Sequence, residues 1–150
     1  MNRNIILSLL LLVSTVVSAQ VESPVSFSYS AKKINTLTYE LHITAEIQSG
    51  WHTYSQTTPA GGPIPTALKF TKNPLVTFVG KVKEVGKLEQ HHEKLFGVDV
   101  KQFSNKVDFV QVIKLKKPLK TNIAGSIEFM VCNDVQCLPP SVNKFSIQIH

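Results

Sequence analysis

Polar and apolar side chains alternate along residues 36–48 with almost no break. The apolar positions are Leu37, Tyr39, Leu41, Ile43, Ala45 and Ile47, and Thr, Glu, His and Gln occupy the positions between and beside them. Successive side chains of a β-strand point to opposite faces, so a period of two places all the apolar residues on one face. This segment therefore predicts an antiparallel strand with one face on a core and the other in water.

Similar short runs, rich in Val, Ile, Phe and Thr, recur along the chain. They predict further strands at residues 25–29, 67–71, 75–79, 98–103, 106–115, 123–131 and 145–149. Turn residues separate these runs, among them Ser49-Gly50, Ser104-Asn105 and Lys117-Pro118. We expect an all-β fold, an immunoglobulin-like two-sheet antiparallel sandwich of about seven to nine strands, with a closed barrel as the structural alternative.

The first residues have the pattern of a secretory signal peptide. Arg3 precedes an apolar run over residues 5–17, and the small residues Ser18 and Ala19 follow it. The run is shorter than the ~20 residues that a membrane-spanning helix needs. We expect cleavage after Ala19, so that residues 1–19 are the signal peptide and residues 20–150 are one exported domain. The mature chain is then expected in the oxidising periplasm, without stable membrane insertion.

The charge of the chain argues against a nucleic-acid partner. Its 16 basic residues exceed its 10 acidic ones, which gives a formal net charge of +6. All but one of the basic residues are lysines, and the exception, Arg3, lies in the expected signal peptide. Arginine is the side chain that makes bidentate contacts with phosphate and guanine. The lysine excess is better suited to solubility or to attracting acidic partners.

Two segments lack strand patterning and predict irregular structure. Residues 56–65 contain three prolines and the pair Gly61-Gly62, which predicts a surface loop. Residues 87–97 begin polar and end in Leu95-Phe96-Gly97. Loops ordinarily face water, so this apolar tip either folds back onto the core or serves as a lid.

The only two cysteines, Cys132 and Cys137, lie close together in the sequence and flank a predicted turn. In an oxidising compartment we expect them to form a disulfide. A bond that closes so short a loop adds only about 2 kcal/mol of stability. An exposed disulfide is also open to exchange with other thiols. The residues alone leave two interpretations open, a structural staple and a redox-active pair.

The neighbours of the cysteines offer little to a metal ion. Two sulfurs make half of a tetrahedral zinc site, and neither a CxxC nor an HxxxH partner accompanies them. His91 and His92 are adjacent in a polar segment, where histidines are usually solvated. We therefore expect neither a metal nor another cofactor.

The segment Gly50-Trp51-His52-Thr53-Tyr54 contains the only tryptophan of the chain. One interpretation is a core aromatic followed by a tyrosine anchor. The other is an aromatic wall beside the cysteine pair, and the residues alone do not decide between them.

Taken together, residues 25–149 resemble the N-terminal periplasmic domain of the thiol:disulfide interchange protein DsbD, and more closely the stand-alone disulfide bond corrector relatives of that domain. The most specific part is the run Cys132-Asn-Asp-Val-Gln-Cys137-Leu-Pro-Pro140 between two predicted strands. Residues 50–54 and 65–70 resemble an aromatic-rich strand of the family and the segment that follows it.

The resemblance implies an immunoglobulin-like sandwich with a redox-active disulfide. Cys137 would form the mixed disulfide with a partner, and Cys132 would resolve it. The resemblance implies further site residues in two groups. The cap loop over the disulfide would contain Glu93, Leu95, Phe96 and Gly97, and the surrounding pocket would contain Trp51, His52, Tyr54, Asp134 and Pro139.

The family passes electrons between thioredoxin-like oxidoreductases, so these are the expected partners, with a membrane electron transporter acting in trans and the chain itself a monomer. Three departures from the family pattern stand out. The cysteine spacing is one residue shorter than in the best-known form, Leu95 replaces the leading aromatic residue of the cap, and the membrane and thioredoxin modules are absent from this sequence. The rival function is a non-catalytic exported binding module with a structural hairpin disulfide.

Overall fold

The computed structural model describes residues 23–150, so the expected signal peptide, residues 1–19, lies outside the described residues. Residues 23–150 form nine strands, which are β1 (Val25–Lys33), β2 (Thr38–Ile47), β3 (His52–Tyr54), β4 (Ala67–Phe70), β5 (Val76–Glu93), β6 (Val98–Leu115), β7 (Thr121–Phe129), β8 (Val131–Cys132) and β9 (Ser141–Ile149). No helix able to cross a bilayer occurs in this range.

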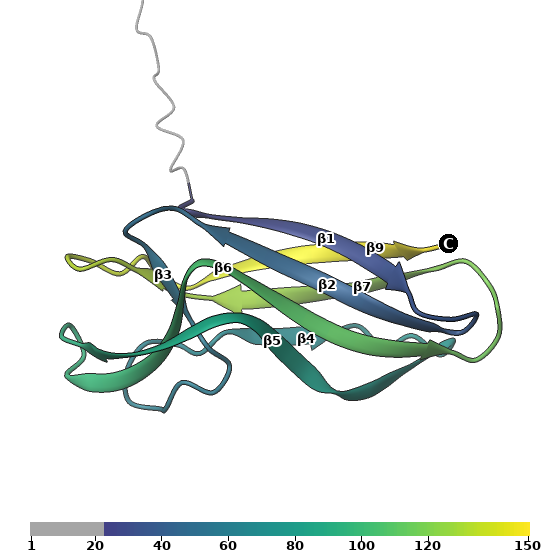
Figure 1. The fold of residues 1–150 in the computed structure, drawn as a ribbon, viewed down its shortest axis with the longest axis horizontal. Helices are drawn as coiled ribbons and strands as arrows, with labels where there is room; N and C mark the ends of the chain where they lie inside the picture. Colours follow the sequence, from purple (N-terminus) through teal and green to yellow (C-terminus); the bar gives the residue numbers. More distant parts are fainter. Residues whose placement is uncertain (1–22) are drawn as a thin grey trace, which may run out of the picture.

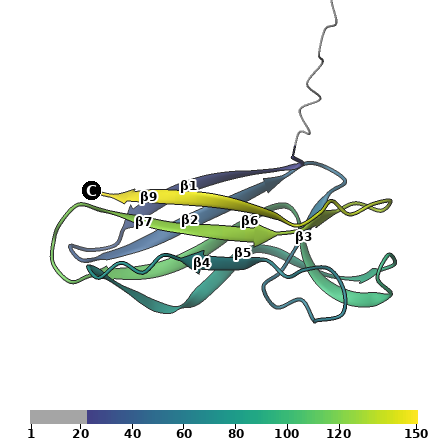
Figure 2. The same cartoon turned by 180° about the vertical axis from the view of Figure 1, so that it is seen from behind.

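The strands form two antiparallel sheets that lie face to face (Figures 1 and 2). The larger sheet has six strands in the order β1-β2-β6-β3-β8, and β5 pairs with the other edge of β6. The smaller sheet has three strands in the order β4-β7-β9. The prediction of an all-β, immunoglobulin-like sandwich is therefore confirmed, and the barrel alternative is not what the described residues form.

The core lies between the sheets and follows the predicted alternation. Every apolar position of β2 from Tyr39 to Ile47 is buried, and the residues between them are half-buried or exposed. The smaller sheet contributes Ile123, Ile127 and Ile147 to the same core. Burial of one such side chain contributes roughly 1.5–3 kcal/mol, so these faces hold the sheets together.

The prediction that residues 87–97 are irregular is wrong. β5 continues to Glu93 and pairs with β6 as far as Val98, so that only four residues form the turn between the two strands. This segment lacks the alternation of polar and apolar residues because both faces of this part of β5 are largely exposed. Leu88, Gln90 and His91 are all exposed to solvent. A strand without a buried face has no reason to alternate.

The predicted turn at Ser104-Asn105 is also wrong, because β6 runs through it without reversing direction. Asn105 has a φ of 66°, a left-handed conformation that asparagine tolerates better than most residues. At this point β6 exchanges one neighbour for another, pairing with β3 up to Ser104 and with β2 from Lys106 onward. Asn105 therefore marks a local irregularity within one long strand.

Candidate functional site

The two cysteines form a disulfide across a small hairpin. Cys132 ends β8, and its Cα lies 4.0 Å from that of Cys137. The turn is closed by backbone hydrogen bonds on either side of this bond. Asn133 N–H donates to the Gln136 carbonyl, and Leu138 N–H donates to the Val131 carbonyl, both at 2.9 Å. Backbone pairing therefore shapes the hairpin around the disulfide.

The two sulfurs differ in their access to solvent. Cys132 is completely buried, in a small cluster with Tyr54 and Val100 that is separate from the main core. Cys137 is only half-buried, at the margin of the same cluster. A visiting thiolate can therefore reach Cys137 more readily than Cys132.

Asn133 organises the exposed part of the hairpin. Its Oδ1 accepts hydrogen bonds from the backbone N–H groups of Val135 (2.9 Å) and Gln136 (2.8 Å). This side-chain turn is a recurrent use of asparagine, which could have marked the position in the sequence. Val135, at the tip, is 81% exposed.

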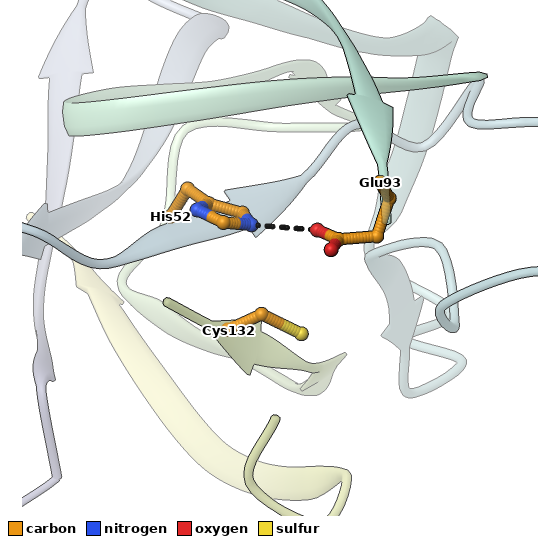
Figure 3. Close-up of side chains that lie close together, drawn as sticks. All are labelled: His52, Glu93 and Cys132. Atoms are coloured by element: carbon orange, nitrogen blue, oxygen red, sulfur yellow. Dashed lines mark hydrogen bonds and ion pairs between the residues drawn. The ribbon is translucent and has the colours of Figure 1, made fainter. Parts of the chain in front are cut away.

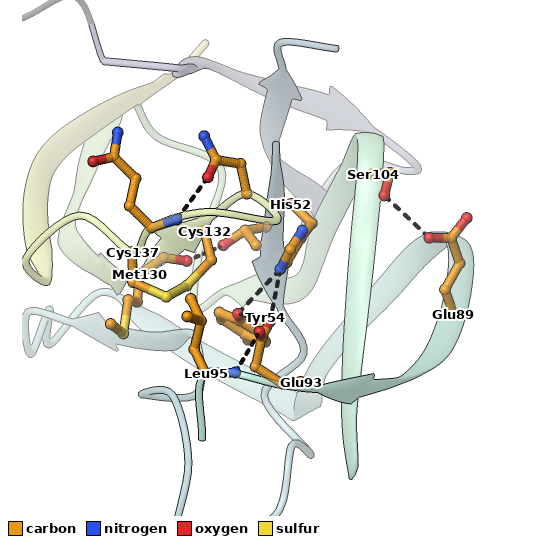
Figure 4. A network of polar contacts seen from close by, with 12 residues as sticks. His52, Tyr54, Glu89, Glu93, Leu95, Ser104, Met130, Cys132 and Cys137 are labelled. Atoms are coloured by element: carbon orange, nitrogen blue, oxygen red, sulfur yellow. Dashed lines mark hydrogen bonds and ion pairs between the residues drawn. A yellow bond between two sulfur atoms is a disulfide. The ribbon is translucent and has the colours of Figure 1, made fainter. Parts of the chain in front are cut away.

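A buried polar group lies beside Cys132 (Figures 3 and 4). His52, the first residue of β3, is the register partner of Cys132 on β8. Its Nε2 lies 3.2 Å from Oε2 of Glu93, the last residue of β5. The hydroxyl of Tyr54 donates to the same carboxylate oxygen at 2.9 Å and lies 3.1 Å from His52 Nε2. The three side chains thus satisfy one another away from water.

The carboxylate of Glu93 is the charged centre of this group. Burial alone would raise the pKa of Glu93, but hydrogen bonds from Tyr54, His52 and the Leu95 backbone outweigh it, and the pKa lies below its ordinary value. The pKa of Tyr54 is raised, first by burial and then by the hydrogen bond to Glu93 and its negative charge. Glu93 is therefore ionised and Tyr54 is a neutral donor at physiological pH.

The turn after Glu93, residues 94–97, lies beside the disulfide hairpin and is called the cap here. Phe96 and Gly97 N–H groups donate to the Glu93 carbonyl at 3.2 and 2.8 Å, and Gly97 has a φ of 67° that suits glycine. Leu95 N–H contacts Glu93 Oε1 at 3.4 Å, and its side chain points toward the disulfide in Figure 4. Leu95 and Phe96 nevertheless remain 49% and 38% exposed.

The loop at residues 56–65 packs against the cap. A Cβ at Gly62 would lie 2.5 Å from Val98 Cγ2 and 3.7 Å from Phe96 Cβ, so the loop backbone touches the base of the cap hairpin. The Thr58 hydroxyl is hydrogen-bonded to the backbone of Lys101 on β6. The cap thus packs against a loop that is itself hydrogen-bonded to β6.

Of the remaining predicted pocket residues, Asp134 and Pro139 lie on or next to the cysteine hairpin, and Trp51 lies apart from it. Asp134 lines a hollow of about 300 Å³ beside the site, together with His52, His91, Glu93 and Lys94. Pro139 is exposed just after the hairpin. Trp51 is half-buried and packs against the main core rather than in the cluster that contains Cys132.

Three possible metal ligands also meet here. One nitrogen of His52, one carboxylate oxygen of Glu93 and the sulfur of Cys132 lie within 4.8 Å of one another, and all three residues are buried. The resemblance placed His52 and Glu93 near the disulfide but did not predict their direct contact. The two residues are 41 positions apart, and only the pairing of β3, β5, β6 and β8 brings them together.

Three solved structures have a fold similar to that of this chain. The N-terminal periplasmic domain of ScsB from Proteus mirabilis is 16% identical, with a TM-score of 0.54 over 83% of this chain. The chain spans 44% of that ScsB chain. The reduced DsbD N-terminal domain of Neisseria meningitidis is 15% identical, with a TM-score of 0.51, over 81% of this chain and 83% of that one.

A third structure is the complex between the DsbD and PilB N-terminal domains of Neisseria meningitidis, 12% identical, with a TM-score of 0.52 over 84% of each chain. No curated protein matches the chain. At these identities the structures establish the fold. Residues 18–149 match the family described as thiol:disulfide interchange protein DsbD, N-terminal. This match spans nearly the whole chain, and the protein therefore belongs to the DsbD N-terminal domain family.

Proposed function

We propose that the chain is an exported thiol–disulfide exchange domain that relays reducing equivalents between thioredoxin-like oxidoreductases through Cys132 and Cys137. The observation that carries this proposal is the unequal access of the two sulfurs, one half-buried under a partly exposed cap and the other fully buried. The bond joins residues only five positions apart and does not link the two sheets. Accessible local disulfides are the ones that exchange.

In the proposed reduction step, a thiolate of the donor attacks Cys137 Sγ and the bond to Cys132 Sγ breaks. Cys132 leaves with the electron pair and takes up a proton. A second donor thiolate then attacks the donor sulfur of the mixed disulfide and releases Cys137. The donor leaves as a disulfide, and two electrons and two protons have passed to this chain.

The second half of the cycle reverses these roles. The Cys137 thiolate attacks a disulfide of the acceptor, which forms a new mixed disulfide and releases one acceptor thiol. Cys132 then attacks Cys137 Sγ, which restores the disulfide and releases the second acceptor thiol. Cys132 therefore resolves and Cys137 contacts the partner, in agreement with their burial.

The hairpin can make this change without unfolding. The hydrogen bonds from Asn133 N–H and Leu138 N–H involve backbone atoms only, and the Asn133 side chain adds two more. These contacts do not depend on the sulfur–sulfur bond. This supports a switch over a structural staple, since a staple would hold together segments that nothing else joins.

The same proposal assigns the setting and the partners. Cleavage of the signal-peptide pattern after Ala19 would release the mature chain, residues 20–150, into the periplasm, where we propose that it acts as a monomer. The proposal includes a membrane electron transporter, acting in trans, as a further partner beside the thioredoxin-like oxidoreductases. The excess of lysines, 15 of them against 10 acidic residues, favours acidic surfaces on the thioredoxin-like partners.

A trapping experiment tests the exchange function. Cys132→Ser leaves Cys137 without a resolving thiol, so this variant should accumulate mixed disulfides with exported thioredoxin-like proteins, seen on non-reducing gels and identified by mass spectrometry. The matched Cys137→Ser variant keeps only the buried thiol and should trap far less. Equal trapping by both variants, or trapping by neither, would contradict the proposal.

A second measurement separates the exchange domain from a binding module with a structural disulfide. Reduction of the wild-type protein should leave its circular dichroism spectrum at 25 °C unchanged and lower its melting temperature by roughly 5–10 °C. The short loop makes this expectation quantitative, because the bond contributes about 2 kcal/mol. Unfolding upon reduction would favour the structural staple.

A further inference from the structure

The group formed by His52, Glu93 and Cys132 combines three kinds of metal ligand in one buried place. An imidazole nitrogen, a carboxylate oxygen and a sulfur lie within 4.8 Å of one another (Figure 3). They come from β3, from the end of β5 and from β8, so the strand pairing of the larger sheet holds them in position. Zn²⁺ is bound by these ligand types in four-coordinate sites.

The disulfide decides whether the sulfurs are available. In the oxidised chain each sulfur is bonded to the other and carries no negative charge, so the site lacks thiolate ligands. After reduction both sulfurs remain on the same hairpin, whose cysteine Cα atoms lie 4.0 Å apart in the oxidised chain. Reduction therefore frees Cys132 Sγ, which lies within 4.8 Å of the nitrogen and the oxygen, and Cys137 Sγ, which the disulfide holds next to it.

We propose that the reduced protein binds a zinc-type divalent cation through His52, Glu93, Cys132 and Cys137, and that disulfide formation abolishes this site. The inference rests on the proposed function only in requiring that the pair be reducible. Metal capture would hold both thiols as thiolates bound to the ion. A bound cation would thereby block exchange with partners.

The surroundings of the group fit a metal site. Tyr54 donates to Glu93 Oε2 and so orients the carboxylate, the role of outer-shell partners in metalloproteins. His52 and Glu93 also line the hollow of about 300 Å³ that His91, Lys94 and Asp134 border, which gives a cation a route inward. One carboxylate and two thiolates would carry three negative charges in a buried place. Such charges are costly to bury unless a metal ion binds them, so the site favours a divalent cation.

Each step balances chemically. A phosphine reductant breaks the sulfur–sulfur bond, forms two thiols and leaves as the phosphine oxide with an oxygen atom from water. Metal binding then forms two metal–sulfur bonds and releases the two thiol protons to solvent. Partners are not needed for either step, so the metal site can be tested apart from electron relay.

The experiment compares the two redox states of the wild-type chain. The protein is reduced with a phosphine, desalted without oxygen and titrated with Co²⁺, whose thiolate charge-transfer and tetrahedral ligand-field absorption report sulfur coordination. The reduced chain should bind one Co²⁺ with these bands, and Zn²⁺ should displace it. The oxidised chain should produce neither band. Binding of equal strength in both states, or no thiolate band in the reduced state, would overturn the proposal.

Single substitutions then assign the ligands. Glu93→Gln and His52→Gln should each weaken Zn²⁺ binding by roughly tenfold or more, since even outer-shell changes cost that much. His92→Ala is the matched control, because His92 is exposed, is hydrogen-bonded to Asp99 and does not belong to the group. Unchanged affinity in both ligand variants would also overturn the proposal. Melting of each oxidised variant verifies its folding.

The outcome is independent of the exchange function. Mixed-disulfide trapping and partner reduction are measured in the presence of EDTA, where no metal is bound. A chain that exchanges thiols in EDTA but shows no thiolate–cobalt band keeps its proposed function and loses the metal site. A chain that binds Co²⁺ but traps no partner keeps the metal site and loses the proposed exchange function.

Discussion

The phenol of Tyr54 donates a hydrogen bond of 2.9 Å to the carboxylate of Glu93, 39 residues further along the chain. The contact joins the short strand β3 to the last residue of β5, directly before the cap turn. His52 contacts the same carboxylate oxygen from the same strand. The buried contacts of Glu93 with His52 and Tyr54 therefore hold the base of the cap on β3. Its apolar tip remains partly exposed to solvent.

Tyr54→Phe should loosen this fastening. The substitution removes one donor from a buried carboxylate and should lower the free energy of unfolding by about 1–3 kcal/mol. Amide hydrogen exchange of residues 94–97 should accelerate. Tyr39→Phe is the control, because that buried hydroxyl donates to the His150 carbonyl at the C-terminus. The prediction fails if both variants exchange equally fast at the cap.

Leu95→Ser should expose the disulfide. Leu95 points toward the bond (Figure 4), and removal of about 1 kcal/mol of apolar cover corresponds to roughly fivefold faster reduction by dithiothreitol. Because Leu95 is 49% exposed and its loss costs only about 1 kcal/mol, the melting temperature should fall by only roughly 3–5 °C. Val135→Ser, at the 81% exposed tip of the cysteine hairpin, should leave the rate as it is. Identical rates in both variants would show that Leu95 does not shield the bond.

Gly62→Val should disturb the support under the cap. The first atom of the new side chain would already lie 2.5 Å from Val98 Cγ2, and overpacking of this kind costs about 1–3 kcal/mol. Urea unfolding measures the loss. Ala60→Val adds the same kind of side chain at an exposed position of the same loop and should be nearly neutral. Two equally stable variants would mean that the loop adapts without cost.

Asn105→Val should destabilise the middle of β6. A β-branched residue at a φ of 66° costs about 1–2 kcal/mol, whereas glycine adopts this conformation freely. The free energy of unfolding of Asn105→Gly should therefore exceed that of Asn105→Val by about 1–2 kcal/mol. Chemical denaturation of the two variants checks the difference. A Val variant as stable as the Gly variant would argue that β6 straightens when its sequence requires it.

The sandwich and the disulfide hairpin follow from local sequence patterns. β2 alternates because one of its faces lies on the core along its whole length, and the pattern records this burial directly. The cysteine hairpin is marked by residues that act within a few positions of one another, from Cys132 to Pro140. Such features are readable because their physical causes are local.

The remaining features depend on contacts between distant segments. The outer half of β5 carries polar residues on both faces, and only its pairing with β6 makes it a strand. Asn105 has the character of a turn residue, but its neighbours pair with β3 on one side and with β2 on the other, which keeps the chain extended. The contact between His52 and Glu93 leaves no trace in the local sequence of either.

The irregularity at Asn105 has a counterpart in β5, whose register with β6 shifts between Gly86 and Leu88. The two breaks lie opposite one another, so they divide the β5–β6 hairpin into an inner arm within the sandwich and an outer arm that carries the cap. The neighbour of β6 also changes at this level, from β2 on the inner arm to β3 on the outer arm. The position of the cap therefore depends on the short strands β3 and β8 rather than on the long ladder of the core.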